Sequence, residues 1–379
     1  MIGIWDLVVV GAGPAGSSAA LAALALCPSA RVLLLDRSDF PRDKACGDGI
    51  APHVLDLLEE VGVGGLLEDR VAVEQLELVR GSDAVLRRMA RPAWVVPRSV
   101  LDARLVDAAV RAGATLLRRR VRTVRRRADR VVLDDELEGR YVVAADGAHS
   151  VLRARLGPPS PGRTALALRG YSPTPPQRRG RQVIAFGSGR QPSYAWSFDR
   201  GDGLANVGYG ELLRGRAPQR RDLLDRLERL LPGSTQHGHA WRGHHLPLSS
   251  WRWQQPDGRI LFAGDAAHLV NPVTGEGIYY AVATGMLAGR TAVAIGADPA
   301  DAGARHRAAV RALLGRHLRH TALASRLLDV PGVVTGGLRA AAADQGTFDD
   351  LVELGLGRGR LTPRVVAGIA CGITGRGGG

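Results

Sequence analysis

The stretch WDLVVVGAGPAG, from Trp5 to Gly16, decides the fold of this chain. Its apolar first half predicts a buried strand, and the small residues from Ser17 to Leu26 predict a helix directly after the glycines. In such a pattern the first glycine permits a tight turn, the second lets a pyrophosphate approach the backbone, and the third lets the helix pack on the strand. The phosphates would lie at the N-terminus of the helix. The stretch therefore predicts dinucleotide binding at Gly11, Gly13 and Gly16.

The next strands support the same prediction. Arg31 to Leu35 predicts a second strand, and Asp36 at its end stands about twenty residues beyond the glycines, where an acidic side chain can bind ribose hydroxyls. Arg140 to Ala145 predicts another buried strand, which ends in Asp146 and Gly147. If that strand returns beside the first, it brings both residues towards the dinucleotide.

A second glycine-rich segment, GDAAHLVNPVTGEGIYYAVATG from Gly264 to Gly285, joins an apolar strand to an apolar helix. Its glycines let the backbone approach a flat ligand without a Cβ in the way. A helix that starts near Gly277 would point unpaired N–H groups at that ligand and favour negative charge on it. Asp265, at the end of the strand, could hold a sugar hydroxyl. In isolation, an ordinary connection with an aspartate cap would look the same.

One lysine and one cysteine stand out in the segment PRDKACGDG, from Pro41 to Gly49. Lys44 is the only lysine among 51 lysine and arginine residues, so its position suggests a site that needs a compact ammonium group. Chance survival of one lysine is the alternative. Cys46, beside Lys44 and glycine, is either a partly activated thiol near a ligand or a buried structural cysteine.

Several local features follow from the pattern. Val100 to Ala112 predicts a helix capped by Ser99, with Arg98 able to reach a phosphate. A strand pair around Val121 and Val131 carries an arginine run, and Arg290 to about Leu328 predicts one helix. Four histidines match no helical zinc template, so a loop without metal is expected at His237, His239, His244 and His245.

Composition limits the functional classes. The formal net charge of +14 suits an anionic partner, although arginine at nearly every cationic position also indicates a coding bias. No nucleic-acid motif is present, so the charge favours anionic lipid headgroups over nucleic acid as the partner. No apolar run reaches the length of a membrane span, and no signal segment precedes the first strand. We therefore expect a cytoplasmic protein with three free thiols that can bind peripherally at the inner face of the membrane.

Together, GAGPAG, VVAADGAHS (142–150) and GDAAHLVNP (264–272) resemble the FAD-binding fingerprints of para-hydroxybenzoate-hydroxylase-like flavoproteins. Three further motifs are similar to those of the geranylgeranyl reductase family: PRDKACGDG, YAWSF (194–198) followed by GYG (208–210), and NPVTGEGIYYA. The resemblance spans about residues 4 to 290. One departure is Asp199, where the family pattern has proline. This difference raises a question about the shape and polarity of the substrate cavity.

The resemblance implies an α/β fold in which a Rossmann-like FAD-binding domain, with a parallel sheet and helices, is interleaved with a largely antiparallel substrate domain. We assign residues 1–70, 98–160 and 255–300 to the first domain, 71–97 and 161–254 to the second, and 301–379 to a C-terminal helical region. The cofactor would contact Gly11, Gly13, Ala15, Gly16, Asp36, Arg37, Arg98, Asp146, Gly147, Gly264, Asp265, Gly275, Gly277 and Ile278. Catalysis would involve Lys44, Cys46 and Gly47, and the substrate would contact Tyr194, Trp196, Phe198, Gly208 and Gly210.

Family members saturate isolated double bonds in polyprenyl chains with reduced FAD. The resemblance thus implies reduction of a polyprenyl lipid, diphosphate or prenylated quinone, with Cys46 as the best candidate for the proton donor and water as the second. A single dinucleotide fingerprint leaves NADPH or a protein donor as the transient reductant. The main alternative is an FAD-dependent monooxygenase with an aromatic or polyketide-like substrate. A flavin halogenase and a lipid-binding flavoprotein without activity are further alternatives, and the sequence leaves the oligomeric state open.

Overall fold

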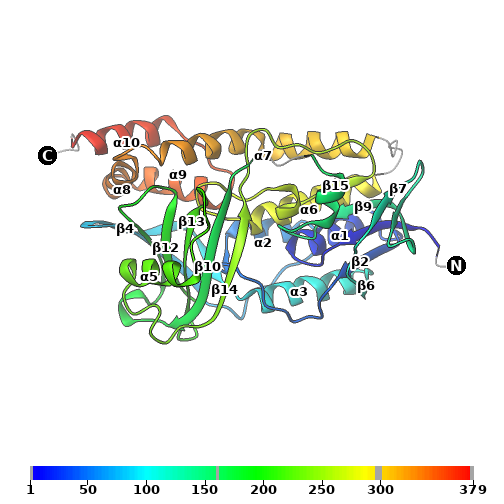
Figure 1. Cartoon of the computed structure of the whole chain (residues 1–379), viewed down its shortest axis with the longest axis horizontal. Coiled ribbons are helices and arrows are strands. Elements are labelled where there is room, and N and C mark those ends of the chain that lie inside the picture. The colour runs from blue at the N-terminus through cyan, green and yellow to red at the C-terminus, as the bar shows by residue number, and fades with distance from the viewer. Residues whose placement is uncertain (1–2, 159–161, 295–300, 376–379) are drawn as a thin grey trace.

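The structure, a computed structural model, describes residues 3–158, 162–294 and 301–375. Two β-sheets lie at opposite ends of an elongated molecule, and a layer of helices runs along one side of both (Figure 1). None of the helices in these ranges has the length and apolar character needed to span a bilayer. The large cavity described below runs between the two sheets.

The first sheet has seven strands and is mainly parallel. Its centre is β1 (Trp5–Val10), which pairs in parallel with β2 (Val32–Asp36) on one side and β9 (Leu137–Ala144) on the other. The expected return of β9 beside β1 is confirmed, and it brings Asp146 next to Gly11, where an added Cβ would lie 3.0 Å from Cα of Asp146. The remaining strands are β6 (Thr115–Arg118), β7 (Val124–Arg126), β8 (Val131–Leu133) and β15 (Ile260–Phe262).

Helices of small residues cover this sheet. α1 (Pro14–Leu26) and α6 (Ile278–Val293) pack closely, because glycines remove the side chains between them. A Cβ at Gly285 would lie 2.1 Å from the carbonyl oxygen of Ala15, and one at Gly289 would lie 2.0 Å from that of Ala19. The other helices around this sheet are α2 (Pro52–Glu59), α3 (Arg98–Arg111), α4 (Val151–Leu156) and α7 (Ala302–Leu327).

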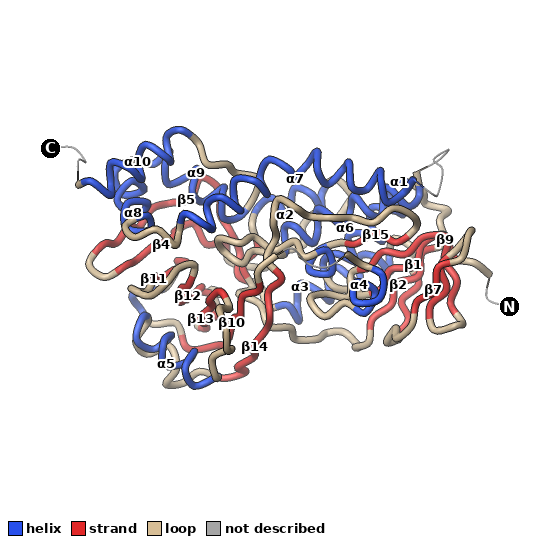
Figure 2. Tube along the Cα trace, turned by 45° about the horizontal axis from the view of Figure 1, so that its top comes forward, coloured by secondary structure: helices blue, strands red, loops and turns tan. Residues whose placement is uncertain are grey.

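The second sheet has eight strands and is antiparallel except where β11 meets β4. The C-terminal helices cover the face opposite α5, so that the sheet is buried on both sides (Figure 2). Its strands are β3 (Gly49–Ile50), β4 (Ala72–Arg80), β5 (Asp83–Val95), β10 (Thr164–Pro173), β11 (Arg181–Phe186), β12 (Ser193–Asp199), β13 (Leu204–Leu212) and β14 (His239–Pro247). The helices are α5 (Arg220–Leu230), α8 (Val333–Ala343), α9 (Gln345–Leu356) and α10 (Pro363–Thr374).

Three local expectations were wrong, and a fourth was right except at one residue. Ser99 lies inside α3 and does not cap it, because Pro97 holds the N-cap position without a side-chain bond. The expected strand pair is present as β7 and β8 and contains Val131, but β7 begins only at Val124, so Val121 precedes it. The segment expected as one helix from Arg290 is divided, since the backbone at Ala294 is extended before α7 begins. The predicted histidine loop is largely β14, a strand at the edge of the sheet that pairs with β10, and it contains His239, His244 and His245.

Candidate functional site

A cavity of about 940 Å³ connects the two halves of the molecule. It begins beside Asp36 at the carboxyl end of the first sheet, passes Gly13 and Cys46, and continues between the second sheet and the C-terminal helices to Phe348. Its size is at the upper end of the usual range for small-molecule sites. One end therefore meets the dinucleotide fingerprint and the other end is apolar.

The glycine fingerprint builds a phosphate cradle at the first end. Gly11 has φ +100°, and a Cβ there would lie 2.3 Å from the carbonyl oxygen of Ala145. Gly16 does not line the cavity. A Cβ at Gly16 would lie 1.7 Å from the carbonyl oxygen of Gly11, so this glycine permits the contact between helix and strand. Gly13 lines the cavity at the N-terminus of α1. Because no side chain caps this helix, the N–H groups of its first turn are open to an anion.

Two arginines add positive charge to the cradle. An added Cβ at Gly13 would lie 3.4 Å from Nη2 of Arg42 and 3.6 Å from Nη2 of Arg98. Arg98 donates to both oxygens of the fully buried Asp102, at 2.6 and 2.8 Å. Burial disfavours charge on Arg98, but Asp102 outweighs this effect and raises the Arg98 pKa. The Nε of Arg42 is buried without a hydrogen-bond partner among the described residues. This cradle fits the pyrophosphate of FAD.

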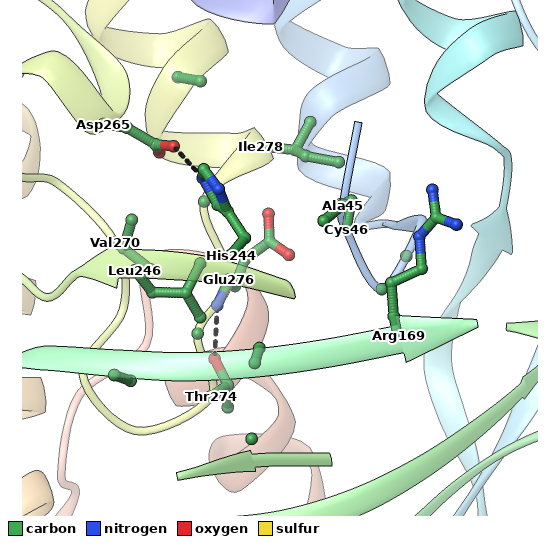
Figure 3. Close-up of a pocket in the computed structure, with 18 of the residues that line it drawn as sticks. Ala45, Cys46, Arg169, His244, Leu246, Asp265, Val270, Thr274, Glu276 and Ile278 are labelled. Atoms are coloured by element: carbon green, nitrogen blue, oxygen red, sulfur yellow. Dashed lines mark hydrogen bonds and ion pairs between the residues drawn. The ribbon is translucent and has the colours of Figure 1, made fainter. Parts of the chain in front are cut away.

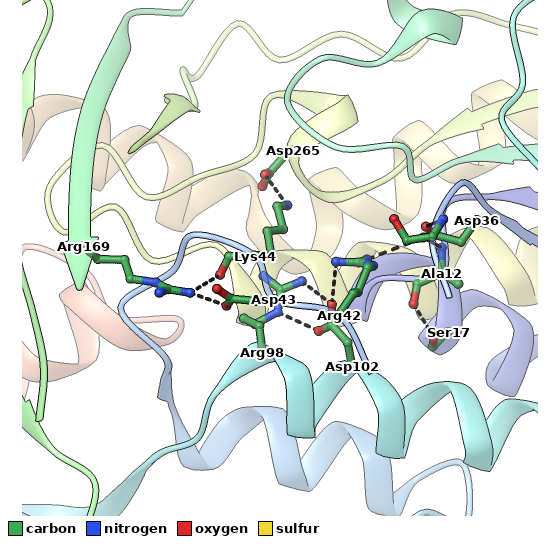
Figure 4. Close-up of polar contacts among 11 residues, drawn as sticks. Ala12, Ser17, Asp36, Arg42, Asp43, Lys44, Arg98, Asp102, Arg169 and Asp265 are labelled. Atoms are coloured by element: carbon green, nitrogen blue, oxygen red, sulfur yellow. Dashed lines mark hydrogen bonds and ion pairs between the residues drawn. The ribbon is translucent and has the colours of Figure 1, made fainter. Parts of the chain in front are cut away.

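The adenosine end of the cavity is formed by β2. The Asp36 carboxylate accepts from the backbone N–H of Ala12 at 2.9 Å and from Arg42 at 3.5 Å, as Figure 4 shows. Ala15 and Arg37 line the cavity beside it. Asp36 thus has the position that an acid needs to reach ribose hydroxyls, while its second oxygen, Oδ1, holds the N–H of Ser38.

Asp146 and Gly147, which follow β9, line the middle of the cavity. Asp146 accepts from the backbone N–H of Val151 at 2.7 Å and so holds the start of α4. Burial raises the pKa of Asp146, although hydrogen bonds to its carboxylate oppose the effect. Gly147 has φ +80°, which suits glycine, and Lys44 lies against it.

The loop before α6 presents backbone and charge to the same cavity. Gly275, Gly277 and Ile278 line it, and α6 begins directly after Gly277 without a side-chain cap. Gly264 does not line the cavity. It has φ +57°, and a Cβ there would lie 3.2 Å from those of Ala15 and Ala281, so it permits close packing.

Lys44 pairs with Asp265 inside the cavity, with Nζ 3.5 Å from Oδ2 (Figure 4). Burial works against charge on Asp265, but Lys44, His244 and Arg98 outweigh it and hold the Asp265 pKa well below its usual range. In the described part of the chain, no group of three or more His, Cys, Asp or Glu side chains is arranged to hold a metal ion.

Cys46 lies where the two ends of the cavity meet. Its loop is fixed from the second sheet, because Asn206 donates to the Cys46 carbonyl at 2.9 Å and to Asp48 at 2.8 Å. The buried Arg169 donates to the Lys44 carbonyl at 3.1 Å and also binds Asp43. Burial raises the pKa of the Cys46 thiol to about 11, so the thiol keeps its proton at neutral pH.

The three aromatic residues of β12 share one face of the strand and line the cavity beyond Cys46. Tyr194 donates to the Thr274 carbonyl, and Trp196 donates to Asn206 at 2.8 Å. Phe198 lies against Gly47, where an added Cβ would be 3.5 Å from its ring. Of the two β13 glycines, Gly210 lines the cavity. Gly208 does not, but a Cβ there would lie 2.2 Å from Trp196, so it makes room for that ring.

Asp199 has a structural role outside the cavity. It is buried, accepts from the Thr174 hydroxyl at 2.9 Å and from the Gly180 N–H at 2.7 Å, and is not among the residues that line the cavity. The departure from the family pattern therefore affects a turn beside the sheet.

Sequence reasoning missed two parts of the site. Glu276 lines the cavity, and in Figure 3 its carboxylate lies between His244 and Cys46. Burial raises the Glu276 pKa to about 7, and backbone N–H groups of α6 oppose the effect. In the sequence, the signal for Glu276 is its place in the motif GEG, directly before an apolar helix. The C-terminal helices close the apolar end, which is lined by Leu328, Val334, Leu338, Phe348, Leu351 and Ile369.

Comparison with known proteins agrees with this geometry. The FAD binding domain family matches residues 5–174. A menaquinone reductase of Mycolicibacterium smegmatis is 34% identical over 311 residues, which are 75% of each chain. Digeranylgeranylglycerophospholipid reductase 1 of Methanopyrus kandleri is 33% identical, over 76% of this chain and 80% of that protein. A geranylgeranyl bacteriochlorophyll reductase-like structure from Thermoplasma acidophilum shares the fold, with a TM-score of 0.77, 21% identity and 98% of both chains covered.

Proposed function

Because the chain belongs to the geranylgeranyl reductase family of FAD-dependent oxidoreductases, we propose that it saturates carbon–carbon double bonds of a polyprenyl lipid, diphosphate or prenylated quinone. One observation carries the proposal: a single cavity joins the cationic cradle at Gly13 to an apolar chamber, with Cys46 at the junction. An isoprenoid tail fits such a chamber, because burial of its methylene and methyl groups is favourable.

The residues of the chain have separable roles in this reaction. FAD, when bound and reduced, supplies a hydride equivalent to one alkene carbon. The chamber excludes water and orients the chain, with the β12 aromatic residues against it. Cys46 donates its thiol proton to the second carbon, and Glu276 returns a proton to the resulting thiolate. This direction is downhill, because the pKa of Cys46 is about 11 and that of Glu276 is about 7.

A direct test compares an unsaturated substrate with its saturated counterpart. Protein reduced with dithionite under anaerobic conditions is mixed with geranylgeranyl diphosphate or with the fully saturated diphosphate. We expect the oxidised flavin spectrum to return only with the unsaturated compound. Equal behaviour of the two compounds would contradict the proposal.

NADPH or a protein donor reduces the flavin in this proposal, since one dinucleotide fingerprint is present. Anaerobic bleaching of the flavin by NADPH alone identifies the first, and bleaching only by a reduced protein donor identifies the second. We also propose that the enzyme acts at the inner face of an anionic membrane, which its net charge of +14 favours. A monooxygenase is the rival function, and the names of the two relatives as reductases favour reduction.

Glu276→Gln should flatten the pH dependence of turnover. The protonated form of Glu276 resupplies the proton, and this form is present below its pKa of about 7 and lost above it. Turnover of the unaltered enzyme should therefore fall as the pH rises through about 7, and the glutamine variant should lack this step. The measurement is kcat under anaerobic conditions from about pH 5 to pH 9.

Asp48→Asn is the matched control, because Asp48 stands two residues after Cys46 and burial raises its pKa to about 6. Arg98 and Asp265 also face Glu276, and both keep their charge through this range because the Arg98 pKa is raised and the Asp265 pKa is lowered. The asparagine variant should keep the inflection near pH 7. If the inflection were lost in Asp48→Asn and kept in Glu276→Gln, the pH dependence would be assigned to Asp48.

Gly337→Phe should shorten the chamber. Gly337 lines the cavity on α8, and an added Cβ would have only an ordinary contact, 4.0 Å from Ile369, so a larger side chain can project into the chamber. We expect normal FAD content and a loss of activity that grows with the length of the prenyl chain. The measurement is kcat/KM for geranyl and geranylgeranyl diphosphates. An equal loss with both would contradict the assignment of this space to the tail.

A further inference from the structure

Exposed apolar side chains gather on the outside of the helices that close the chamber. Near the end of α7, Leu323 and Leu327 are 50% and 39% exposed, and Val330 in the following turn is 49% exposed. On α10, Val366 and Ile373 are 54% and 44% exposed. These five residues, here called the apolar strip, come from two stretches that are far apart in the sequence. Large exposed side chains of this kind indicate a contact surface when they adjoin one another.

The two halves of the strip adjoin one another. Leu323, Leu327 and Val330 follow helical spacing, as do Val366 and Ile373, which are seven residues apart. A Cβ at Gly332, in the turn after α7, would lie 3.5 Å from the side chain of Ile373. The turn therefore rests on the end of α10 and joins the two stripes. Figure 1 shows the ends of α7, α8 and α10 together at one end of the molecule.

The strip lies on the far side of the same elements that line the chamber. Leu328 faces the chamber whereas its neighbour Leu327 is exposed, and Ile369 faces the chamber between the exposed Val366 and Ile373. α10 carries one charged residue, Arg364, in its twelve positions. The same elements thus carry the apolar end of the chamber on one face and an apolar outer surface on the other.

The charge around the strip suits an anionic surface. Residues 316–330, which include the α7 half of the strip, contain three arginines and one carboxylate, Asp329, which pairs with Arg214. Arg316, Arg319 and Arg326 are exposed on the last turns of α7; two of them precede Leu323, and the third lies between Leu323 and Leu327. Basic side chains that border apolar ones at a helix surface are typical of proteins that lie on anionic membranes.

We propose that the apolar strip docks on an anionic bilayer and places the apolar end of the chamber against the lipid from which the substrate is drawn. This inference rests on the proposed prenyl-lipid function and names the surface that meets the membrane. A second copy of the chain is the alternative occupant. A second copy would cover the same side chains, but its binding would not depend on the arginines around them.

The test is co-sedimentation of the FAD-loaded, full-length protein with vesicles of phosphatidylglycerol and phosphatidylcholine, or of phosphatidylcholine alone. We expect salt-sensitive binding to the anionic vesicles, and a loss of on the order of tenfold in Val366→Ser/Ile373→Ser. The control is Val110→Ser/Leu116→Ser, which changes side chains that are 43% and 40% exposed on α3 and β6. This control should bind as the unaltered protein does.

Two further measurements separate the possible outcomes. Turnover of a short, detergent-dispersed prenyl substrate should be equal in Val366→Ser/Ile373→Ser and the unaltered enzyme. Absence of turnover in both would count against the proposed function but not against the docking surface. Unchanged vesicle binding in the variant would overturn the docking proposal. A dimer that the same substitutions convert to a monomer, with no effect on vesicles, would assign the strip to a second copy.

Discussion

Cys46→Ala is expected to keep its FAD and lose turnover by about 10²- to 10⁴-fold, the usual contribution of a positioned proton donor. The cradle at Gly13, Arg42 and Arg98 is untouched by this change, so cofactor content and visible spectrum should stay normal. The loss should lie in kcat, because the thiol gives its proton only when the alkene is reduced. Single-turnover reoxidation of the reduced flavin by substrate measures the affected step.

Two variants complete this test. Cys27→Ala removes a free thiol that does not line the cavity, and it should have full activity. Cys46→Ser keeps a hydroxyl in place of the thiol and should retain more turnover than the alanine variant. Full activity in Cys46→Ala would remove Cys46 from the mechanism and leave Glu276 or water as the proton source.

Gly11→Ala is expected to weaken FAD binding strongly. Gly11 has φ +100°, which alanine rarely adopts, and the new Cβ would lie 2.3 Å from the Ala145 carbonyl oxygen. Because that contact is with backbone, β1 and the segment after β9 must separate, and the phosphate cradle opens. We expect affinity for FAD to fall on the order of a hundredfold, or about 2.7 kcal/mol.

The measurement is FAD titration of the apoprotein, together with the thermal midpoint. Gly189→Ala is the matched control, since its Cβ would meet nothing within 4 Å and its backbone is not left-handed. The control should bind FAD normally. Normal binding by Gly11→Ala as well would show that the cradle tolerates a side chain, against the account given for this fingerprint.

The sequence predicts the local backbone of the expected cofactor end, because that backbone is built from local patterns. The turn at Gly11, the acid at Asp36 and the start of α6 after Gly277 each depend on a few neighbouring residues. Gly264 shows the limit of this reasoning. Its place in the GDAAH motif predicts a ligand contact, but its left-handed φ and its contacts with Ala15 and Ala281 show a packing role.

The chamber could not be predicted, because it depends on contacts between distant segments. Phe348 and Leu338 are core residues of α9 and α8 that face β4 and β5, more than 240 positions earlier in the chain. No motif marks them. The β14 histidines were placed in a loop for another reason: HAWRGHHLP contains glycine, proline and no β-branched residue, and pairing with β10 determines its structure.

The most direct test of the central claim is mass spectrometry of the lipid product. Protein reduced with dithionite is incubated under anaerobic conditions with geranylgeranyl diphosphate or a prenylated quinone, and a parallel sample is incubated in air. The account predicts gain of hydrogen pairs by the prenyl chain without oxygen, in amounts that match the flavin oxidised. Incorporation of oxygen in air, with no hydrogen gained in the anaerobic sample, would contradict it and establish a monooxygenase on this fold.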